Sequence, residues 1–370
     1  MEWTRGSVLG RGSSATVSTA TSTSGEVFAV KSVALSQSES LQKEKHFLSI
    51  FKNSCVVGYK GCEVSRENGK MVYNLFMEFM SSGSIVDLLN RRNGVGLTDL
   101  EIRRFTRQIV EGLDYVHDSG VVHCDIKGGN VLIDESGAKI GDFGCAKWVC
   151  DDEFGTTIRG TPLFMAPEVA RGEEQGFPAD VWAVGCTVIE MATGGLPWSN
   201  LNDPVSVLYK IGFSGEIPGI PDGFSGELKD FVGKCLVRDP KQRWTAKQLL
   251  KHPFVIGEFD DQNPKEIIRE KMITDSPTSI LDQDVWNSME ESLSLESSVG
   301  IEFCETTCSW NSLRQRIKQL SDKSEIPKWG CEKGESDWMT IRMNEDGDGK
   351  SSGGAVEGGR CGRWRWIAAP

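Results

Sequence analysis

The sequence predicts an α+β fold built in two lobes, a strand-rich front lobe followed by a helix-rich back lobe. Two observations indicate this order. Short apolar runs rich in strand-forming residues occur within the first 80 residues, at 27–30 and 73–77. From residue 84 onward, apolar residues recur mainly at steps of three or four, the spacing of one face of a helix. Strands that precede helices, rather than alternate with them, favour α+β over α/β.

The front lobe is expected to span 1–80 and to contain one helix. That helix is predicted at 40–51, where large apolar residues stand among lysines and glutamates: Leu41, Phe47, Leu48 and Phe51. The back lobe is expected to span 81–256. Its clearest helix is predicted at 99–117, and the apolar residues that form its buried face are Ile102, Phe105, Ile109, Leu113 and Val116.

The composition changes after residue 256, and we expect 257–370 to be an acidic, serine-rich tail that is mostly disordered. Its last part, 347–370, is rich in glycine and arginine. Short helical patches are predicted at 282–295 and 313–320. A tail of this kind could act in regulation by binding other proteins.

Charge and cysteine content exclude several classes of function. The net charge of −12 over 370 residues argues against nucleic acid or an anionic membrane as the main partner. The longest apolar stretch, 181–196, falls short of the roughly 20 residues of a membrane span, so it is expected to be a buried helix. The 11 cysteines show no paired C-x-x-C spacing, which argues against a zinc site or a disulfide framework. The expected compartment is the reducing cytoplasm or the nucleus.

A glycine-rich turn, with Gly10, Gly12, Ala15 and Val17 as its marked positions, lies ahead of the run at 27–30, between two strands predicted at the start of the front lobe. Glycines let the backbone close over phosphate groups, whose oxygens can accept hydrogen bonds from free N–H groups. A plain glycine-rich hairpin is the alternative interpretation, and Ala15 stands where a third glycine is usual. The pattern indicates a nucleotide site only together with other motifs.

Lys31 ends the apolar strand at 27–30, which follows the glycine-rich turn at a distance that suits a phosphate-binding lysine, although a charge at a strand end is the ordinary interpretation. Its partner would be an acid on the predicted helix 40–51. Glu44 is the preferred partner, and Glu39, close to the helix start, is the alternative.

Three further motifs follow in order: HCDIKGGN at 123–130, DFG at 142–144 and APE at 166–168. Each tripeptide is common alone, but this order and spacing behind the glycine turn and Lys31 is not expected by chance. The chain, over about 3–254, resembles the protein kinase family. The resemblance implies a two-lobed kinase fold that binds ATP and Mg²⁺ between the lobes.

The resemblance also implies roles for individual residues. Asp125 would accept the proton of the substrate hydroxyl, and Lys127 would steady the γ-phosphate. Asn130 and Asp142 supply oxygen ligands suited to Mg²⁺. Lys31, paired with Glu44, would hold the α- and β-phosphates. The residues that would enclose or contact the rest of the nucleotide are Leu9, Gly10, Gly12, Val17, Ala29, Met77, Glu78, Met80 and Leu132.

Lys127 together with Thr161, in the run Gly160-Thr161-Pro162, resembles serine/threonine kinases rather than tyrosine kinases. Thr161 would shape the floor under the acceptor and bond Asp125 or Lys127. Three positions match structural parts of the family, namely Asp180 as support of the catalytic loop and Glu168 with Arg243 as a buried ion pair.

The chain is most similar to a short plant subgroup of the mitogen-activated protein kinase kinase kinases. The residues that carry this resemblance lie at 2–6, 123–128, 142–148, 159–168, 203–209 and 275–279. It implies that the substrate is itself a kinase, a downstream mitogen-activated protein kinase kinase, and that the setting is plant stress signalling. A pseudokinase scaffold and an adaptor that works through its tail are the alternatives; the complete set of catalytic residues argues against the first.

Cys124 departs from the family pattern, because an arginine usually precedes the catalytic aspartate and pairs with a phosphate on the activation loop. A packing cysteine is the preferred interpretation of Cys124, and a reactive thiol is the alternative. Thr157 is the predicted phosphosite on that loop, with Thr156 as the alternative. Because this arginine is missing, a phosphate on the activation loop would stabilise the active site less than usual. We therefore expect substantial activity without phosphorylation.

Three patterns in the tail have ordinary explanations. The run at 344–349 begins like a Ca²⁺ loop, but Ala355 stands where a bidentate glutamate is needed. Cys304 and Cys308 have no histidine nearby and are expected to be free thiols. The basic and apolar run at 314–320 is similar to a kinase docking peptide, and a solvated helix is the preferred interpretation.

Overall fold

The structure is a computed structural model that describes residues 2–12, 15–150, 159–198 and 203–257. The predictions for the tail, namely its disorder, the helical patches at 282–295 and 313–320, the Ca²⁺-like run and Cys304 with Cys308, lie outside the described residues. So do the two phosphosite candidates, Thr156 and Thr157.

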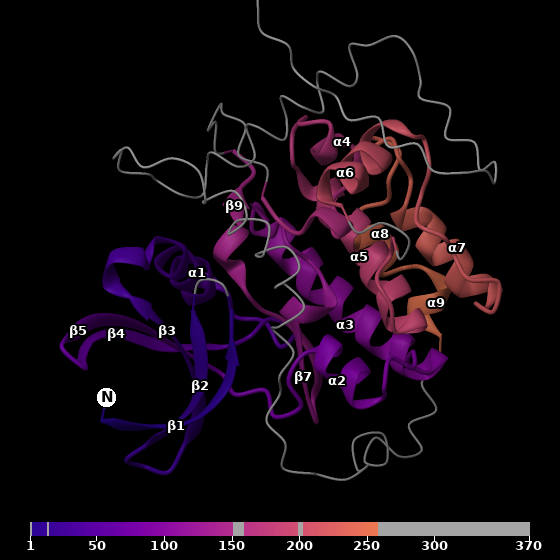
Figure 1. Cartoon of the computed structure of the whole chain (residues 1–370). Coiled ribbons are helices and arrows are strands. Elements are labelled where there is room, and N and C mark those ends of the chain that lie inside the picture. Colours follow the sequence, from indigo (N-terminus) through magenta and orange to yellow (C-terminus); the bar gives the residue numbers. More distant parts are fainter. Residues whose placement is uncertain (1, 13–14, 151–158, 199–202, 258–370) are drawn as a thin grey trace, which may run out of the picture. The chain divides into compact units, whose positions relative to one another are not determined.

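The front lobe is a five-stranded antiparallel sheet with one long helix beside it (Figure 1). Its strands are β1 (Trp3–Arg11), β2 (Thr16–Ser22), β3 (Val27–Ala34), β4 (Tyr59–Glu67) and β5 (Lys70–Met77), in the spatial order β1-β2-β3-β5-β4. The helix α1 (Glu39–Ile50) follows a short 3₁₀ turn at Leu35–Gln37. The strands predicted at 27–30 and 73–77 are confirmed as β3 and β5, and the helix predicted at 40–51 is confirmed as α1. Their boundaries differ from the predicted ones by a few residues.

The burial of α1 explains its amphipathic pattern. Leu41, Phe47 and Leu48 are buried toward the core, and so is the carboxylate of Glu44 on the same side. Glu39 is the first residue of α1 and is exposed. A helix period of 3.6 residues brings position 44 to the face of 41, 47 and 48, so the acid points the same way as the apolar residues.

Side chains at the start of β1 reach across one face of the sheet to strands at its opposite edge. The ring of Trp3 packs edge-on against Phe28 and Phe76, and its Nε1 donates a hydrogen bond to Glu63 at 2.6 Å. Arg5 donates to Glu67 at 2.8 Å and to Asn74 at 3.1 Å. These contacts join β1 to β4 and β5, which are not its neighbours in the sheet.

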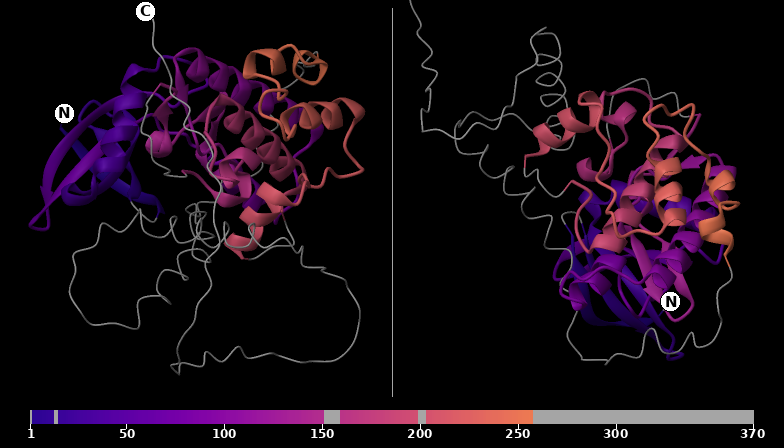
Figure 2. Two further views of the ribbon diagram at one scale, coloured as in Figure 1. Left: turned by 90° about the horizontal axis from the view of Figure 1, so that it is seen from above. Right: turned by 90° about the vertical axis from the view of Figure 1, so that its right-hand side faces the viewer.

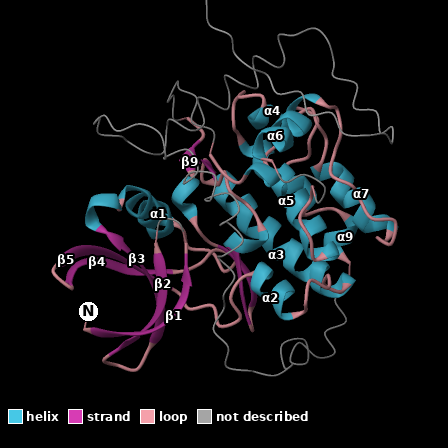
Figure 3. Cartoon of the chain, in the orientation of Figure 1, coloured by secondary structure: helices cyan, strands magenta, loops and turns pink. Residues whose placement is uncertain are grey.

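Helices dominate the second lobe (Figure 3). They are α2 (Ile85–Arg91), α3 (Asp99–Asp118), α4 (Pro167–Ala170), α5 (Phe177–Thr193), α6 (Pro204–Phe213), α7 (Gly226–Cys235), α8 (Ala246–Leu249) and α9 (Pro253–Ile256). The predicted helix 99–117 is confirmed as α3, and all five residues of its predicted apolar face are buried. Figure 2 shows from two further sides that the orange segments, which include α7 to α9, lie away from the indigo strands of the first lobe.

Two devices fix the ends of the longest helices. At the start of α3, Thr98 and Glu101 form a reciprocal capping box, which satisfies two backbone donors of the first turn. At the end of α5, Gly194 takes a left-handed φ of 69°, and a Cβ there would lie 1.9 Å from the carbonyl oxygen of Gly94. Only glycine suits both demands.

The stretch 181–196 is confirmed as a buried helix over most of its length, because residues 181–191 of α5 are all buried. The helix ends at Thr193, so Leu196 lies beyond it and is half exposed. Among the described residues, no helix is long and apolar enough to span a membrane.

Two small sheets in the second lobe were not predicted from the sequence. The strand β6 (Val121–Val122) pairs with β9 (Lys147–Trp148), and β7 (Val131–Asp134) pairs with β8 (Gly137–Ile140). These strands have only two to four residues, which is too short for a periodic pattern to show. They enclose the motifs at 123–130 and 142–144, so each motif lies on a loop held at both ends by a strand.

Candidate active site

Lys31 lies between two carboxylates that come from different parts of the chain. Its Nζ is 2.8 Å from Oε2 of Glu44 on α1 and 3.2 Å from Oδ1 of Asp142. β3 supplies the lysine, and its register with β2 places Lys31 opposite Val17. The structure thus brings together three residues predicted to serve the nucleotide and its metal. The partner of Lys31 is Glu44 and not Glu39.

The electrostatics of this cluster follow from burial and charge. Burial alone would lower the pKa of Lys31, but the carboxylates of Asp142 and Glu44 raise it above its ordinary value. Burial raises the pKa of Glu44 to about 7, against the opposing effect of Lys31. Lys31 therefore stays charged at all physiological pH values, and Glu44 is the member that loses its charge first as the pH falls.

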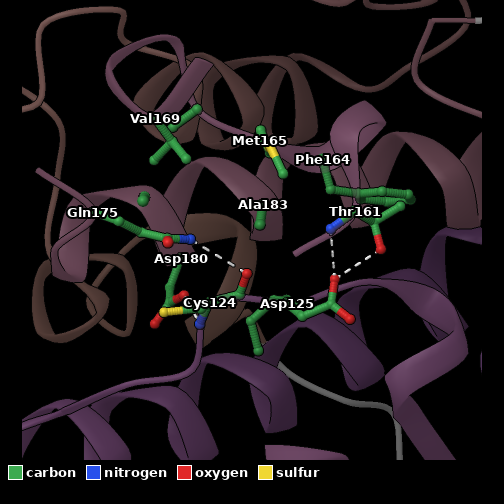
Figure 4. A pocket seen from close by; sticks show the side chains of 12 residues that line it. Cys124, Asp125, Thr161, Phe164, Met165, Val169, Gln175, Asp180 and Ala183 are labelled. Carbon is green, nitrogen blue, oxygen red and sulfur yellow. Dashed lines mark hydrogen bonds between the residues drawn. The ribbon is translucent and has the colours of Figure 1, made fainter. Parts of the chain in front are cut away.

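Asp125 is held by groups on both of its carboxylate oxygens. Oδ1 accepts hydrogen bonds from the N–H of Thr161 at 2.9 Å and from its hydroxyl at 2.8 Å (Figure 4). Oδ2 accepts from the amide of Asn130 at 2.8 Å and lies 3.2 Å from Nζ of Lys127. Nζ of Lys127 in turn donates to the Thr161 hydroxyl at 2.7 Å. Asp125 thus contacts three other residues predicted for the site: Lys127, Asn130 and Thr161.

His123 and Asp180 hold the backbone that carries Asp125. The carboxylate of Asp180 accepts from the N–H of His123 at 2.8 Å and from the N–H of Cys124 at 2.9 Å. His123 accepts at Nδ1 from the N–H of Asp125, so its Nε2 carries the proton and donates to the carbonyl of Gly141 at 3.0 Å. The same ring packs edge-on against Phe143, with centroids 4.7 Å apart. One histidine therefore contacts both catalytic loops.

Asp142 takes a left-handed backbone conformation, with a φ of 57°, which is uncommon for a residue with a Cβ. Its Oδ1 accepts from the N–H of Gly144 at 3.3 Å, and buried Phe143 fixes the turn from below. Burial opposes the charged form, but Lys31 and Lys127 hold the pKa of Asp142 below its ordinary value. The carboxylate is thus ionised.

The oxygens of Asp142 and Asn130 fit a divalent metal ion that prefers hard ligands. Nδ2 of Asn130 donates hydrogen bonds to the carbonyl and to the carboxylate of Asp125, both at 2.8 Å. The amide oxygen of Asn130 therefore points away from Asp125 and is the atom that can bind a metal ion. A carboxylate and an amide oxygen are ligands that Mg²⁺ accepts. No group of three or more histidine, cysteine or acidic residues that could hold a metal ion occurs in the described part of the chain.

The residues predicted around the adenine come from β1, β2, β3, the end of β5 and β7. Gly10 pairs with Val17 across the first hairpin, and Ala29 pairs with Met77. Leu132, on β7, is half-buried against the main core, and Leu9 is half-buried on β1. Gly12 lies at the edge of the described part, where its N–H donates to the carbonyl of Ala15 at 2.9 Å.

The segment after β5 is anchored through Glu78. Its carboxylate accepts from the N–H of Gly58 at 3.0 Å and pairs with Lys139 at 2.6 Å. Its own N–H donates to the carbonyl of Gly58 at 2.8 Å, and Met80 beyond it is buried. The side chain of Glu78 is thus occupied by structure, which leaves the backbone of this segment as the part that can face a ligand.

Cys124 is buried, with a left-handed φ of 69°. Its thiol donates to the carbonyl of Val122 at 3.6 Å. Burial, reinforced by the charge of Asp180, raises the pKa of this thiol well above its ordinary value. These surroundings favour the packing interpretation over a reactive thiol, because the thiolate is the reactive form.

Comparison with known proteins agrees with this geometry. Residues 3–255 match the family model described as protein kinase domain. The chain belongs to the protein kinase family. It is a serine/threonine protein kinase, and as a member of this family it uses ATP and a divalent metal ion.

Several curated plant proteins are similar to this kinase over most of both chains. Mitogen-activated protein kinase kinase kinase 18 of Arabidopsis thaliana is 47% identical over 357 residues, which are 93% of this chain and 100% of the relative. Mitogen-activated protein kinase kinase kinase 17 of the same plant is 44% identical over 94% of each chain. Mitogen-activated protein kinase kinase kinase 20, also from this plant, is 37% identical over 92% of this chain and 100% of the relative.

The buried ion pair suggested by the sequence is present behind the site. Arg243 donates to both carboxylate oxygens of Glu168, at 2.7 and 3.0 Å, and both side chains are almost fully buried. Breaking such a pair leaves one charge without compensation, at a cost of about 3–5 kcal/mol. The pair ties α4, and with it the segment that carries Thr161, to the region before α8.

Sequence reasoning missed three residues that contact this site or its support. His117 lies 2.9 Å from Asp180, Glu190 accepts from the N–H of Gly128 at 2.9 Å, and Gln175 contacts the carbonyl of Cys124. None belongs to a short motif, and each of the three contacts joins residues that are 51 to 63 positions apart in the sequence. A buried acid within an apolar run was the one signal available for Glu190.

Proposed function

We propose that this kinase transfers the γ-phosphate of ATP to serine or threonine residues of downstream mitogen-activated protein kinase kinases. The observation that carries this proposal is the match, over more than nine-tenths of the chain, to plant proteins named as mitogen-activated protein kinase kinase kinases. The assembled ion pair between Lys31 and Glu44 supports a competent enzyme rather than a pseudokinase scaffold.

In this proposal Asp125 orients the acceptor hydroxyl and takes its proton. Two donors of Thr161 on one oxygen and the Asn130 amide on the other fix the carboxylate, so little reorganisation is needed when the acceptor binds. Lys127, 3.2 Å from Asp125, supplies positive charge where the transferred phosphoryl group would lie. Lys31 would hold the α- and β-phosphates.

Asn130 and Asp142 would hold the metal ion, which we propose to be Mg²⁺, through the amide oxygen and the carboxylate. A bound Mg²⁺ neutralises charge on the phosphates during transfer. Asp142 also contacts Lys31 at 3.2 Å, so the groups assigned to the metal and to the phosphates are mutually positioned before any ligand arrives.

The remaining assignments rest on the sequence and stay proposals. We propose that the kinase works in the cytoplasm or the nucleus, and that the tail after residue 256 binds regulatory proteins. A role in plant stress signalling stays a prediction. Deleting the tail separates an enzyme from an adaptor, because an adaptor would lose signalling in cells while its activity in vitro stayed intact.

The decisive experiment incubates the purified full chain with ATP, Mg²⁺ and a panel of kinase-dead mitogen-activated protein kinase kinases, followed by mapping of the phosphorylated sites. We expect rapid modification of serine or threonine in the activation loop of one or a few members. Asp125→Asn is the matched control for contaminating activity. Equal and slow labelling of all members at scattered sites, no faster than labelling of casein, would contradict the proposed substrate class.

A further inference from the structure

The side-chain amide of Gln175 joins two segments that meet beside the catalytic aspartate. Its Nε2 donates to the carbonyl of Arg159 at 3.1 Å and to the carbonyl of Cys124 at 3.4 Å. Arg159 precedes the residues that contact Asp125, and Cys124 is the residue before Asp125 itself. Figure 4 shows the amide reaching the Cys124 carbonyl across the pocket that these segments line. We call this arrangement the Gln175 bridge.

The two bridged segments are in very close contact. Gly160 has a φ of 107°, and a Cβ at that position would lie 2.2 Å from the carbonyl oxygen of Cys124. Any larger residue would push residues 159–161 away from the catalytic loop. The next residue, Thr161, makes its two hydrogen bonds to Asp125 at 2.8 and 2.9 Å. A small displacement of 159–161 would therefore break the two hydrogen bonds on Oδ1 of Asp125.

The peptide of Cys124 is held from both sides. Asp180 accepts from its N–H at 2.9 Å, and Gln175 donates to its carbonyl. Both of these side chains come from one stretch, the approach to α5 and its first turn. Cys124 has a φ of 69°, a conformation that costs free energy for a residue with a Cβ and persists only where the surroundings fix it. The paired contacts supply that fixation.

The Gln175 bridge needs no phosphate. Its donor is an uncharged amide and its acceptors are backbone carbonyls, whereas the family's usual link between these segments is an arginine that binds a phosphorylated loop. The position of that arginine is taken here by Cys124, whose short side chain is buried. The two carbonyls of the bridge belong to the residues directly before Asp125 and Gly160, and its hydrogen bonds do not include Lys31 or Asp142, which are assigned to the nucleotide and its metal.

We propose that Gln175 is a positioning residue that holds 159–161 against the catalytic loop, so that the site can engage a protein acceptor before the activation loop is phosphorylated. The inference deepens the regulation of the same site, and it rests on kinase activity alone rather than on the identity of the downstream substrate. It therefore predicts a defect in transfer to a protein acceptor and a normal response to ATP.

The test compares two variants with a matched control in the full chain. Gln175→Leu removes the amide at nearly equal size, and Gln175→Asn keeps the amide but is one methylene too short to reach both carbonyls. Gln108→Leu is the control, because Gln108 also makes two backbone contacts, to Ser136 at 3.1 Å and to Ala138 at 2.8 Å, but these lie in the β7–β8 hairpin rather than beside Asp125. All proteins are treated with phosphatase before assay, and casein serves as the acceptor.

The readouts are phosphorylation of casein, hydrolysis of ATP without acceptor, the KM for each substrate and the temperature of unfolding. We expect both Gln175 variants to lose at least tenfold in kcat/KM for casein, while the KM for ATP and the rate of ATP hydrolysis stay within about twofold of wild type. The control should keep both activities. Acceptor transfer and ATP hydrolysis that fall together, or casein transfer unchanged in Gln175→Asn, would overturn the proposal. Wild-type activity on casein is measured first, so a wrong downstream substrate does not affect the outcome.

Discussion

The carboxylate of Glu190 on α5 accepts a hydrogen bond from the backbone N–H of Gly128 in the catalytic loop, at 2.9 Å. The contact explains why residue 128 is glycine, because a Cβ there would lie 2.5 Å from Oε2 of Glu190. Glu190 is buried, and burial raises its pKa to about 7, against the opposing effects of the Gly128 N–H and of Lys127. A buried acid thus supports the catalytic loop from the last turn of α5.

This relationship predicts how Glu190→Gln changes stability with pH. From its ordinary pKa of 4.5 up to about 7, folded Glu190 keeps a proton that the unfolded chain has released. Its contribution to stability is therefore fully present below the unfolded pKa and is lost as the pH rises through 7. Glutamine accepts the same hydrogen bond without titrating. The stability of the variant relative to wild type should therefore increase between pH 5 and pH 8. The difference is on the order of 3 kcal/mol at 1.36 kcal/mol per pKa unit.

The measurement is the unfolding temperature of wild type and Glu190→Gln at several pH values from 5 to 8. Glu173→Gln is a control, because Glu173 is an exposed carboxylate whose pKa is lowered by its hydrogen bonds to Arg171 rather than raised. Parallel curves for wild type and Glu190→Gln would show that Glu190 keeps the same protonation state throughout.

Asp142→Asn should abolish phosphoryl transfer and leave the fold intact. The change removes a carboxylate assigned to the metal ion and its 3.2 Å contact with Lys31, yet preserves size. A filter assay of phosphate transfer measures the loss, and the unfolding temperature checks the fold. Asp134→Asn is the control, because Asp134 is the last residue of β7 and bonds the turn to β8. Turnover within tenfold of wild type, which is only about 1.4 kcal/mol, would contradict the assignment of Asp142.

Cys124 should resist alkylation in the folded protein. Its thiol is buried and its pKa is raised well above the ordinary value, whereas Cys150 is exposed. We expect iodoacetamide at pH 8 to modify Cys150 at least a hundredfold faster, as followed by mass spectrometry of the two peptides. Equal rates after denaturation are the control. Similar rates in the native protein would revive the reactive-thiol interpretation.

Thr157→Ala should retain substantial activity. The Gln175 bridge and the Thr161 contacts to Asp125 order the end of this segment without a phosphate. Three acids precede Thr157 in the sequence and would partly replace the charge of a phosphate: Asp151, Asp152 and Glu153. Both forms are made in bacteria, checked by mass spectrometry and assayed on casein. A loss above about a hundredfold, roughly 2.7 kcal/mol of barrier, would mean that phosphorylation is the switch.

The sequence predicted the fold and the residues that the structure gathers around Lys31 and Asp125, because these lie in short motifs and periodic elements. It could not predict the supports that act across long separations. Asp180 was suggested only through the family resemblance, and Gln175 and Glu190 were missed, since a single polar residue gives no local pattern. The strands β6 to β9 were also missed, because strands of two to four residues are set by pairing and not by propensity.

The contacts of Trp3 and Arg5 have a consequence for the conformational entropy of nucleotide binding. Their contacts to Glu63, Glu67 and Asn74 fix the beginning of β1 before any ligand is present. A nucleotide therefore does not have to order the first residues of β1 when it binds. Because ordering fewer residues costs less free energy on binding, we expect these two side chains to favour binding without approaching the ligand.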